Sequence, residues 1–314
     1  MLKIPKKVHI MEVGPRDGLQ NEKKIVSIEE KIQYLEKLCL ANVGSIEVTS
    51  FVNPKKVPQM ENSAAVFVEF INKIHPKFPH IRPFVLVPNE KGYNLAKDFG
   101  ATHMAFITAV SDTFCKRNTD CSKEESYKRL EELVKKASID RMQIRVYVST
   151  VFGCPYEGDM DLSKTVELIQ QIKSLGVNEI SLGDTIGVAT PIMVENLLEK
   201  LLDKFGSQIG LDGIAMHFHD TRGMAIANSL ISLHYGVSMF DSSSGGIGGC
   251  PYALGASGNI TTEELVYLLN SFHIEHGVEL NPLLKASKYI LDVLGICSSS
   301  KYVQMIFREG GPVY

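Results

Sequence analysis

The chain has 314 residues, of which 44% are hydrophobic and 22% are charged, proportions typical of a soluble globular enzyme. A formal net charge of −3 without any long basic run argues against a protein that binds nucleic acid or a membrane surface. No apolar stretch is long enough for a transmembrane helix, and the six cysteines include no C-x-x-C pair, so we expect a cytoplasmic protein without a disulfide framework.

Short β-rich runs alternate with helical segments along the whole chain. The predicted strands are Val8–Val13, Ser45–Thr49, Phe84–Val87, His103–Ile107, Ile144–Val148, Glu179–Leu182, Ile214–His219 and Val237–Phe240. Between them, Ser27, Ser122 and Thr261 each stand three residues before a glutamate, the sequence signature of a helix capping box. After the last strand, Asn281–Leu294 and the tail add at least one further helix. Eight strands alternating with helices predict an α/β fold, a (β/α)8 TIM barrel with additional C-terminal helices.

The alternative fold is an open, doubly wound sheet. Such a sheet usually has a G-x-G-x-x-G turn after its first strand, whereas the first turn here, residues 14–20, reads GPRDGLQ. No low-complexity linker divides the chain. We therefore expect one catalytic domain over residues 1–314, with the barrel at about residues 8–275 and a helical extension at about 276–314.

Polar residues follow the predicted strands at the ends where TIM-barrel active sites lie. They are Arg16, Asp17 and Gln20 after the first strand, Glu47 and Ser50 at the second, Ser181 and Asp184 at the sixth, His217 and His219 in the seventh, and Cys250 and Asn259 beyond the eighth. The fold would bring these distant segments together at one rim of the barrel.

His217 and His219 give the sharpest local signal. Residues i and i+2 of a strand point to the same face, so both imidazoles would enter the barrel mouth together. With Asp17 as a carboxylate ligand and Asn259 as an amide oxygen, they form a mixed nitrogen and oxygen site that favours Mg²⁺ or Mn²⁺ over structural Zn²⁺. The alternative is that one histidine only makes a structural hydrogen bond.

Arg16 has two interpretations. It either pairs with Glu47 or Asp184 for structure alone, or it stabilises negative charge that develops on a thioester oxygen. One well-placed donor of this kind is worth on the order of 3–4 kcal/mol. For Glu47 and Asp184 we expect a supporting role rather than direct proton transfer.

A glycine-rich segment, residues 245–252 (GGIGGCPY), carries Cys250. One interpretation is a phosphate-binding loop, or a turn with an inactive thiol. The other, which we favour, is a mobile loop that places the thiol over the site, where the cysteine would donate a proton.

The chain closely resembles the 3-hydroxy-3-methylglutaryl-CoA lyases over nearly its whole length. The resemblance lies in residues 15–22 (PRDGLQNE), 46–52 (IEVTSFV), 153–158 (GCPYEG), 181–187 (SLGDTIG), 217–221 (HFHDT), 248–252 (GGCPY) and 255–259 (GASGN). The Arg-Asp and His-x-His elements are shared with a wider group of metal-dependent barrels, including isopropylmalate and homocitrate synthases. The cysteine loop is more specific to the lyases.

The resemblance implies a divalent-metal-dependent retro-Claisen cleavage of 3-hydroxy-3-methylglutaryl-CoA into acetyl-CoA and acetoacetate. It implies that Asp17, His217, His219 and Asn259 bind the cation, that Arg16 steadies the enolate, that Glu47 and Asp184 support the site, and that Cys250 lies on a mobile loop. Either Asp17 or His217 would accept the hydroxyl proton, and we expect Cys250 to protonate the enolate. Gln20, Ser50 and Ser181 are expected as further substrate contacts.

Leucine degradation and ketone body metabolism are the pathways that the resemblance suggests. We expect a small-molecule CoA thioester as the substrate and a homodimer or other homo-oligomer, with no nucleic-acid or membrane partner. The chain carries no mitochondrial leader or peroxisomal tripeptide of the kind found in animal relatives, which favours a cytoplasmic enzyme.

Three alternative functions remain open. The first is a lyase of the same mechanism that acts on a related 3-hydroxyacyl-CoA. The second is a Claisen-condensing synthase, although the roughly 55 residues after Asn259 leave little room for the regulatory region that such synthases usually carry. The third is a catalytically inactive barrel that serves as a binding or scaffold protein.

Overall fold

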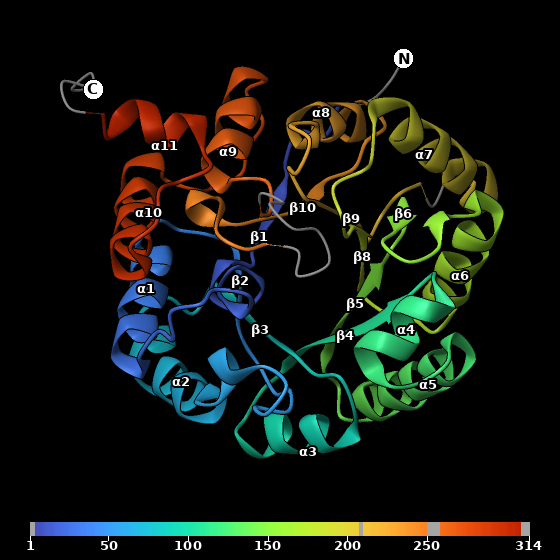
Figure 1. Ribbon diagram of the computed structural model, residues 1–314, viewed down its shortest axis with the longest axis horizontal. Coiled ribbons are helices and arrows are strands. Elements are labelled where there is room, and N and C mark those ends of the chain that lie inside the picture. Colours follow the sequence, from blue (N-terminus) through green and yellow to red (C-terminus); the bar gives the residue numbers. More distant parts are fainter. Residues whose placement is uncertain (1–3, 207–209, 250–257, 309–314) are drawn as a thin grey trace.

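A closed barrel of parallel strands forms the centre of the molecule (Figure 1). The computed structural model describes residues 4–206, 210–249 and 258–308. The strands are β1 His9–Glu12, β2 Ser45–Ser50, β3 Arg82–Leu86, β4 His103–Ala109, β5 Gln143–Ser149, β8 Glu179–Asp184, β9 Ile214–Phe218 and β10 Met239–Ser242. They pair in the order β1-β10-β9-β8-β5-β4-β3-β2, and β2 pairs with β1 to close the circle. Each predicted strand overlaps one of them, which confirms the TIM barrel and excludes the open sheet.

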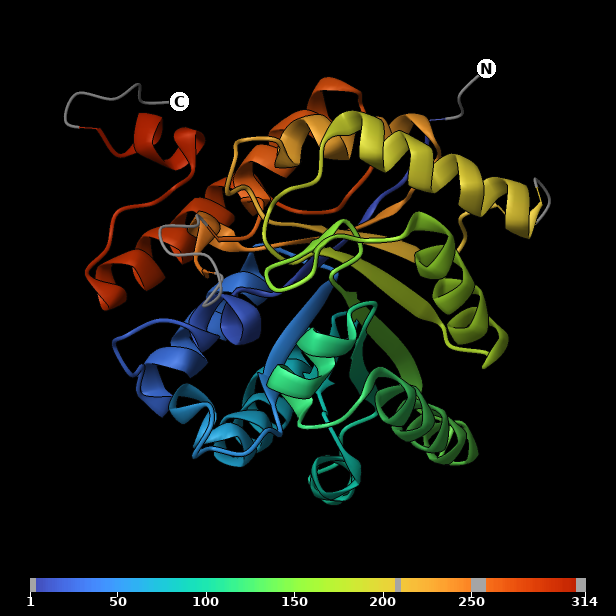
Figure 2. The same ribbon diagram turned by 45° about the vertical axis from the view of Figure 1, so that its right-hand side comes forward.

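Helices surround the barrel on its outside (Figures 1 and 2). They are α1 Ile28–Leu40, α2 Ser63–Glu69, α3 Glu90–Asp98, α4 Asp112–Thr119, α5 Lys123–Ile139, α6 Leu162–Ser174, α7 Pro191–Phe205, α8 Ala225–His234, α9 Thr262–Ser271, α10 Leu280–Leu294 and α11 Lys301–Ile306. The short strands β6 Gly153–Cys154 and β7 Gly158–Asp159 form a hairpin after β5. No helix in the described ranges is both long and apolar enough to cross a membrane.

The predicted helix starts coincide with observed ones. Ser27 and Ser122 form complete capping boxes, in which the serine hydroxyl accepts from the backbone of the third residue and the glutamate there accepts from the serine backbone. Thr261 caps α9 by accepting from the backbone N–H of Glu264 at 3.2 Å. The Glu264 carboxylate instead accepts from the backbone N–H of Lys301 at 2.6 Å, which ties the start of α11 to α9.

Alternation along the strands separates an apolar layer from a polar barrel interior. Outward-facing strand residues such as Ile46, Val85, Phe106 and Ile180 belong to the main core between the barrel and the helices. The inward-facing positions hold small apolar clusters and several charged side chains, among them the buried Arg145. Because side chains alternate with period two, one strand supplies both layers, and the polar interior lies directly beneath the barrel mouth.

The predicted C-terminal helix is present and is followed by another. Helix α10 packs against α1 and against the short helical turn Ser244–Gly246 that follows β10. At its start, the backbone N–H of Glu279 donates to the carbonyl of Ala41 at 2.9 Å, just beyond α1. The segment after the barrel therefore supports the loop that leads to Cys250.

Candidate active site

The turn after β1 carries Arg16 and Asp17. Gly14–Gly18 form one π-helical turn, a distortion that is frequent at functional sites. Arg16 Nη1 donates to Asp17 Oδ1 at 2.7 Å, and Arg16 Nε donates to Oε2 of Glu47, in β2, at 2.5 Å. Of Glu47 and Asp184, the two partners predicted for Arg16, it is therefore Glu47 that Arg16 contacts. The remaining terminal nitrogen, Nη2, makes no hydrogen bond to the described residues, and Arg16 lines a cavity.

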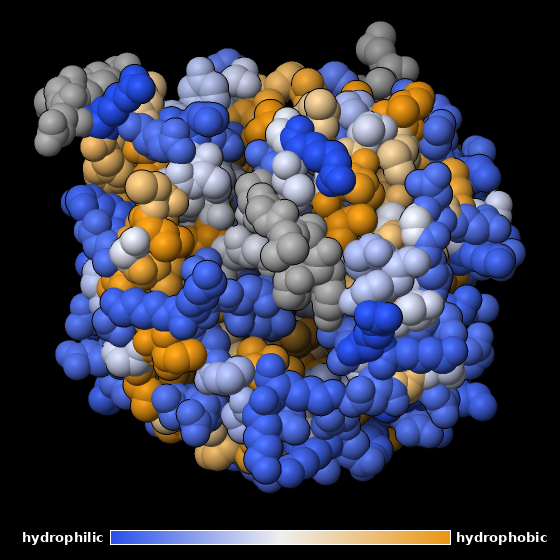
Figure 3. Space-filling model, viewed as in Figure 1, coloured by the Kyte–Doolittle hydropathy of each residue, from blue (hydrophilic) through white to orange (hydrophobic). Residues whose placement is uncertain are grey.

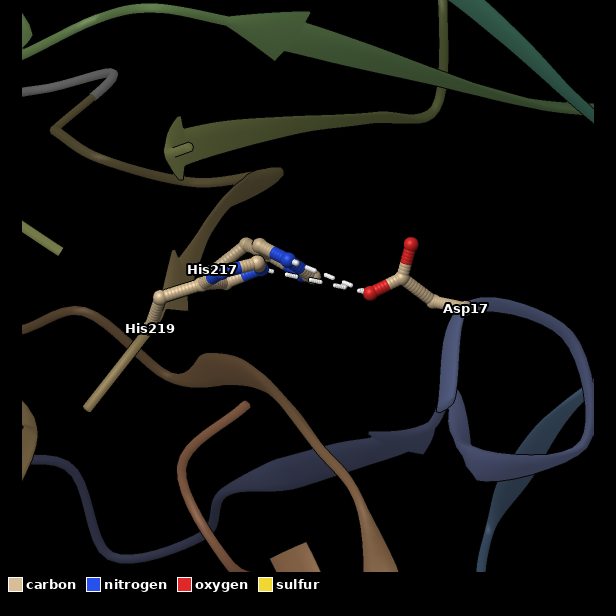
Figure 4. Close-up of side chains that lie close together, drawn as sticks. All are labelled: Asp17, His217 and His219. Atoms are coloured by element: carbon tan, nitrogen blue, oxygen red, sulfur yellow. Dashed lines mark ion pairs between the residues drawn. The ribbon is translucent and has the colours of Figure 1, made fainter. Parts of the chain in front are cut away.

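His217 and His219 point from β9 and the residue after it toward Asp17 (Figure 4). The Nε2 atoms of His217 and His219 lie 3.9 and 4.0 Å from Oδ2 of Asp17. The candidate ligand atoms of these three residues all lie within 4.8 Å of one another. Asn259 forms an isolated bridge with His219, and its Nδ2 donates to Asp17 Oδ2 at 2.9 Å. All four predicted ligands therefore meet at one place.

This donor set fits a divalent cation. Separations of about 4 Å are too long for hydrogen bonds, and they leave room for a cation between the ligand atoms, because two atoms that each lie about 2.0–2.1 Å from one ion are about 3–4 Å apart. The amide oxygen of Asn259 is buried and has no hydrogen-bond partner among the described residues. Two imidazole nitrogens, a carboxylate and an unpartnered amide oxygen form the mixed donor set that Mg²⁺ or Mn²⁺ accepts.

The charges around the site favour the metal-binding protonation states of Asp17 and His219, but not that of His217. Burial by itself would raise the pKa of Asp17, but Arg16 and the two imidazoles hold that pKa well below its usual range. Burial and the neighbouring His217 lower the pKa of His219 to about 4, so this ring is neutral near pH 7. Burial also disfavours charge on His217, but its hydrogen bond to Asp241 and the nearby Asp17 give a raised pKa.

A buried ionic network beneath His217 was not predicted from the sequence. Asp241 Oδ2 lies 3.2 Å from His217 Nδ1 and accepts a hydrogen bond from Ser181 Oγ at 2.6 Å. Asp241 is also ion-paired with Arg145, which in turn pairs with Glu179. The predicted eighth strand ended one residue before Asp241. A charged residue within an otherwise apolar strand, such as Arg145, is the signal that could have revealed this network.

Asp184 and Ser50 lie apart from this cluster in different ways. The carboxylate of Asp184 accepts from the backbone N–H groups of Val188 and Ala189 at 2.9 and 3.1 Å, so it orders the loop after β8, and burial raises its pKa to about 6. The Ser50 hydroxyl donates to the carbonyl of Leu86 at 3.3 Å, and Ser50 is not among the described residues that line the cavity. Cys250 lies outside the described residues.

A cavity of about 640 Å³ leads from the metal-ligand cluster to the surface. Among the residues that line it are Arg16, Asp17, Gln20, Tyr147, Ser181, His217 and His219 at the buried end, and Asn53, Lys56, Arg117, Asp120 and Arg129 near the surface. Figure 3 shows a hollow on this face, with hydrophilic residues around it and apolar residues in its depth. Tyr147 was also missed: its hydroxyl is buried without a partner in the described ranges, and the guanidinium of Arg16 lies 5.4 Å from its ring centre.

Comparisons with known proteins agree with this geometry. The HMGL-like family matches residues 7–290. The human protein named hydroxymethylglutaryl-CoA lyase, mitochondrial, is 46% identical over 96% of this chain and 90% of its own length. A rat 3-hydroxy-3-methylglutaryl-CoA lyase named as cytoplasmic is 43% identical over 97% of this chain and 86% of its own length.

Solved structures give the same result. The hydroxymethylglutaryl-CoA lyase of Pseudomonas aeruginosa has a TM-score of 0.89 and 41% identity, with 96% of this chain and 97% of that chain covered. An HMG-CoA lyase of Acinetobacter baumannii, solved in complex with coenzyme A and 3-methylmalate, has a TM-score of 0.88 and 30% identity over the full length of both chains.

Proposed function

The chain belongs to the HMGL-like family, and on that premise we propose that it is a hydroxymethylglutaryl-CoA lyase, a carbon–carbon lyase that cleaves 3-hydroxy-3-methylglutaryl-CoA into acetyl-CoA and acetoacetate. The observation that carries this function is the meeting of Asp17, His217, His219 and Asn259 at the buried end of one cavity, beside Arg16. The reaction removes a proton from a tertiary hydroxyl, breaks the adjacent carbon–carbon bond and leaves a thioester enolate that must be protonated.

Asp17, His217, His219 and Asn259 are the residues that would hold Mg²⁺ or Mn²⁺. The cation, when bound, supplies Lewis acidity that makes the substrate hydroxyl easier to deprotonate. Asp17 and His217 are the two candidate proton acceptors, and neither is favoured over the other, because both are also proposed cation ligands. The pKa of His217 is raised, but its Nδ1 faces Asp241 and its Nε2 faces the cation site, while Arg16 holds the pKa of the buried Asp17 low.

Arg16 is suited to stabilise the enolate oxygen. Its guanidinium is held by Glu47 and Asp17 through two of its nitrogens, Nη2 has no hydrogen-bond partner among the described residues, and the side chain lines the cavity. A donor that is fixed before the reaction begins needs no reorganisation when charge develops. We retain Cys250 as the proposed proton donor to the enolate, on the grounds of its place in the glycine-rich segment after β10.

The outer end of the cavity suits the phosphates of coenzyme A. Lys56, Arg117 and Arg129 line it, and Asp120, which is ion-paired with Lys56, is the one acid among the described residues that line this end, in a chain whose net charge is −3. A neighbouring surface groove carries as many acids (Glu90, Asp120, Glu125 and Glu132) as bases (Lys91, Lys128, Arg129 and Lys136), so its charge is balanced. The coenzyme A found in the A. baumannii relative supports a thioester of this carrier as the substrate.

We extend the proposal to the biological setting. The products suit leucine degradation and ketone body metabolism. Relatives are named for mitochondria and for the cytoplasm, and we keep the cytoplasm as the proposed compartment. We also propose a homo-oligomer.

The direct test uses the purified protein after its metal has been removed. It is incubated with 3-hydroxy-3-methylglutaryl-CoA, and acetoacetate is measured before and after Mg²⁺ or Mn²⁺ is added. We expect acetoacetate only after the addition. No cleavage with either ion, together with condensation of acetyl-CoA and a 2-oxo acid, would instead identify a synthase. Cleavage of another 3-hydroxyacyl-CoA in preference to this one would identify a related lyase.

The phosphate contacts are tested with a substrate that lacks the phosphates. Arg129→Met should raise KM for the CoA thioester about tenfold, since a hydrogen bond to a charged group is worth about 1.5–3 kcal/mol. The matching thioester of pantetheine should be cleaved equally well by the variant and the wild type. Lys91→Met, in the neighbouring groove, is the control. An equal loss with both thioesters would show that Arg129 does not act through the phosphates.

A further inference from the structure

A buried carboxylate contacts the imidazole of His217 at Nδ1, the ring nitrogen that does not face Asp17. Asp241 lies opposite His217 in the pairing of β10 with β9, and its Oδ2 is 3.2 Å from Nδ1 of that histidine. An ionised carboxylate only accepts hydrogen bonds, so Nδ1 must carry a proton, and in the neutral ring Nε2 therefore keeps its lone pair. That lone pair is on the side of Asp17, whose Oδ2 lies 3.9 Å from Nε2.

Asp241 is itself held in place by two other groups. Ser181 Oγ donates to the same Oδ2 at 2.6 Å, and the buried guanidinium of Arg145 is ion-paired with Oδ1. Arg145 is also paired with Glu179, so charges alternate along a chain of ion pairs inside the barrel. Asp241 cannot turn away from His217 without breaking at least one of these contacts.

His219 lacks this support. Its Nδ1 is buried and has no hydrogen-bond partner in the part of the chain that the structure describes. Its Nε2 nevertheless lies 4.0 Å from the same oxygen of Asp17. The two imidazoles therefore differ, because only the ring of His217 has its tautomer and orientation fixed by a carboxylate.

We propose that Asp241 is a positioning residue for the cation site, which acts by fixing the tautomer and the ring orientation of His217. A carboxylate behind a metal-binding imidazole also makes the nitrogen that faces the ion a stronger ligand. Loss of such a partner typically weakens metal affinity roughly 10–100-fold. This inference rests on the cation site of the proposed function, but it is independent of the substrate's identity.

The first test is a titration of the metal-stripped protein with Mn²⁺. Asp241→Asn keeps the size of the side chain and removes its charge, and we expect Kd for Mn²⁺ to rise roughly 10–100-fold. Glu179→Gln is the matched control, since it removes a charge from the same ion-pair chain without touching His217. Its Kd should stay close to the wild-type value. An unchanged Kd in Asp241→Asn, or equal losses in both variants, would overturn the proposal.

The second test needs no substitution and holds even where Asp241→Asn does not fold. In the metal-free wild type at alkaline pH, nitrogen NMR should show that His217 carries its proton on Nδ1. A proton on Nε2 would refute the role of Asp241. Neither measurement uses the thioester, so a protein that binds Mn²⁺ as expected but does not cleave the thioester would contradict the proposed function alone.

Discussion

Arg16 connects the two halves of the proposed site, since it contacts the metal ligand Asp17 on one side and Glu47 on the other. Both partners are acidic, which leaves its charge largely compensated in the resting protein. Nη2, which has no hydrogen-bond partner in the described ranges, is therefore the part of the side chain that can respond to a new negative charge. Its contribution should appear when the enolate forms rather than when the substrate binds.

Arg16→Gln should lower kcat by about 100-fold or more, because one fixed donor to the developing charge is lost. Affinity for Mn²⁺ should not fall, since the change removes a positive charge beside Asp17. Steady-state kinetics and a metal titration on the same preparation check both statements. A variant with the kcat of the wild type would exclude Arg16 from the mechanism.

Single residues were predictable where one strand or one turn determines their position. His217 and His219 follow from the period of a strand, and Asp17 follows from its place after the first strand. Asp241 and Tyr147 were not predictable in this way. Their environment depends on which residue of a neighbouring strand lies beside them, as Asp241 lies beside His217. The residue pattern within one strand does not predict how that strand is aligned with its neighbour.

At the scale of elements, the segment after β10 is anchored by two buried carboxylates before it reaches Cys250. Glu12 accepts from the backbone N–H of Ser244 at 2.9 Å, and Glu263 accepts from the backbone N–H of Gly245 at 2.9 Å. Gly245 has a φ of 70°, a left-handed conformation that favours glycine. The backbone at Ser244 and Gly245, where the segment that carries Cys250 begins, is therefore held in place.

Cys250→Ala should reduce kcat more than it changes KM, because the proposed role of the thiol is proton donation after the substrate has bound. Cys297→Ala, at an exposed cysteine near α11, is the control. Steady-state kinetics of the two variants with the thioester decide the question. An unchanged kcat for Cys250→Ala would make its thiol an inactive neighbour of the site.

Glu12 should make the stability of the fold depend on pH. Burial raises its pKa to about 8 from the ordinary value of 4.5, so the folded chain holds this proton more tightly than the unfolded chain. The stabilisation is fully present below about pH 4.5 and is lost as the pH rises through about 8. Glu12→Gln cannot ionise, so its Tm should fall less steeply between pH 5 and pH 8.

Thermal unfolding of the metal-free protein across this pH range measures the effect. Glu61→Gln, on the exposed surface, should keep the wild-type slope. Parallel Tm curves for Glu12→Gln and the wild type would show that Glu12 does not titrate in this range.

The elements that could be predicted are those long enough to show a period. The β6–β7 hairpin was missed because two-residue strands have none, and its turn depends on Gly158 at a φ of 75°. Helix α4 was missed for a related reason: it is a short polar helix between β4 and α5. Of these two elements, α4 contributes Phe114, Arg117, Asn118 and Thr119 to the wall of the cavity.

For the whole molecule, the alternation of strands and helices was sufficient to predict a closed barrel. The number of strands and the polar residues at their ends also located the site at one rim. The cavity itself could not be predicted. Its outer wall is assembled from Lys56, Arg117, Asp120 and Arg129, which come from the loop after β2, from α4 and the residue that follows it, and from α5. Their common position follows only from the closed fold.

The position of a bound ion tests the central claim most directly. Crystals of this chain grown with Mn²⁺ would locate the ion by its anomalous scattering. We predict one strong peak in contact with Asp17 Oδ2, His217 Nε2, His219 Nε2 and the amide oxygen of Asn259. An ion bound elsewhere, or one that contacts neither histidine, would contradict the account.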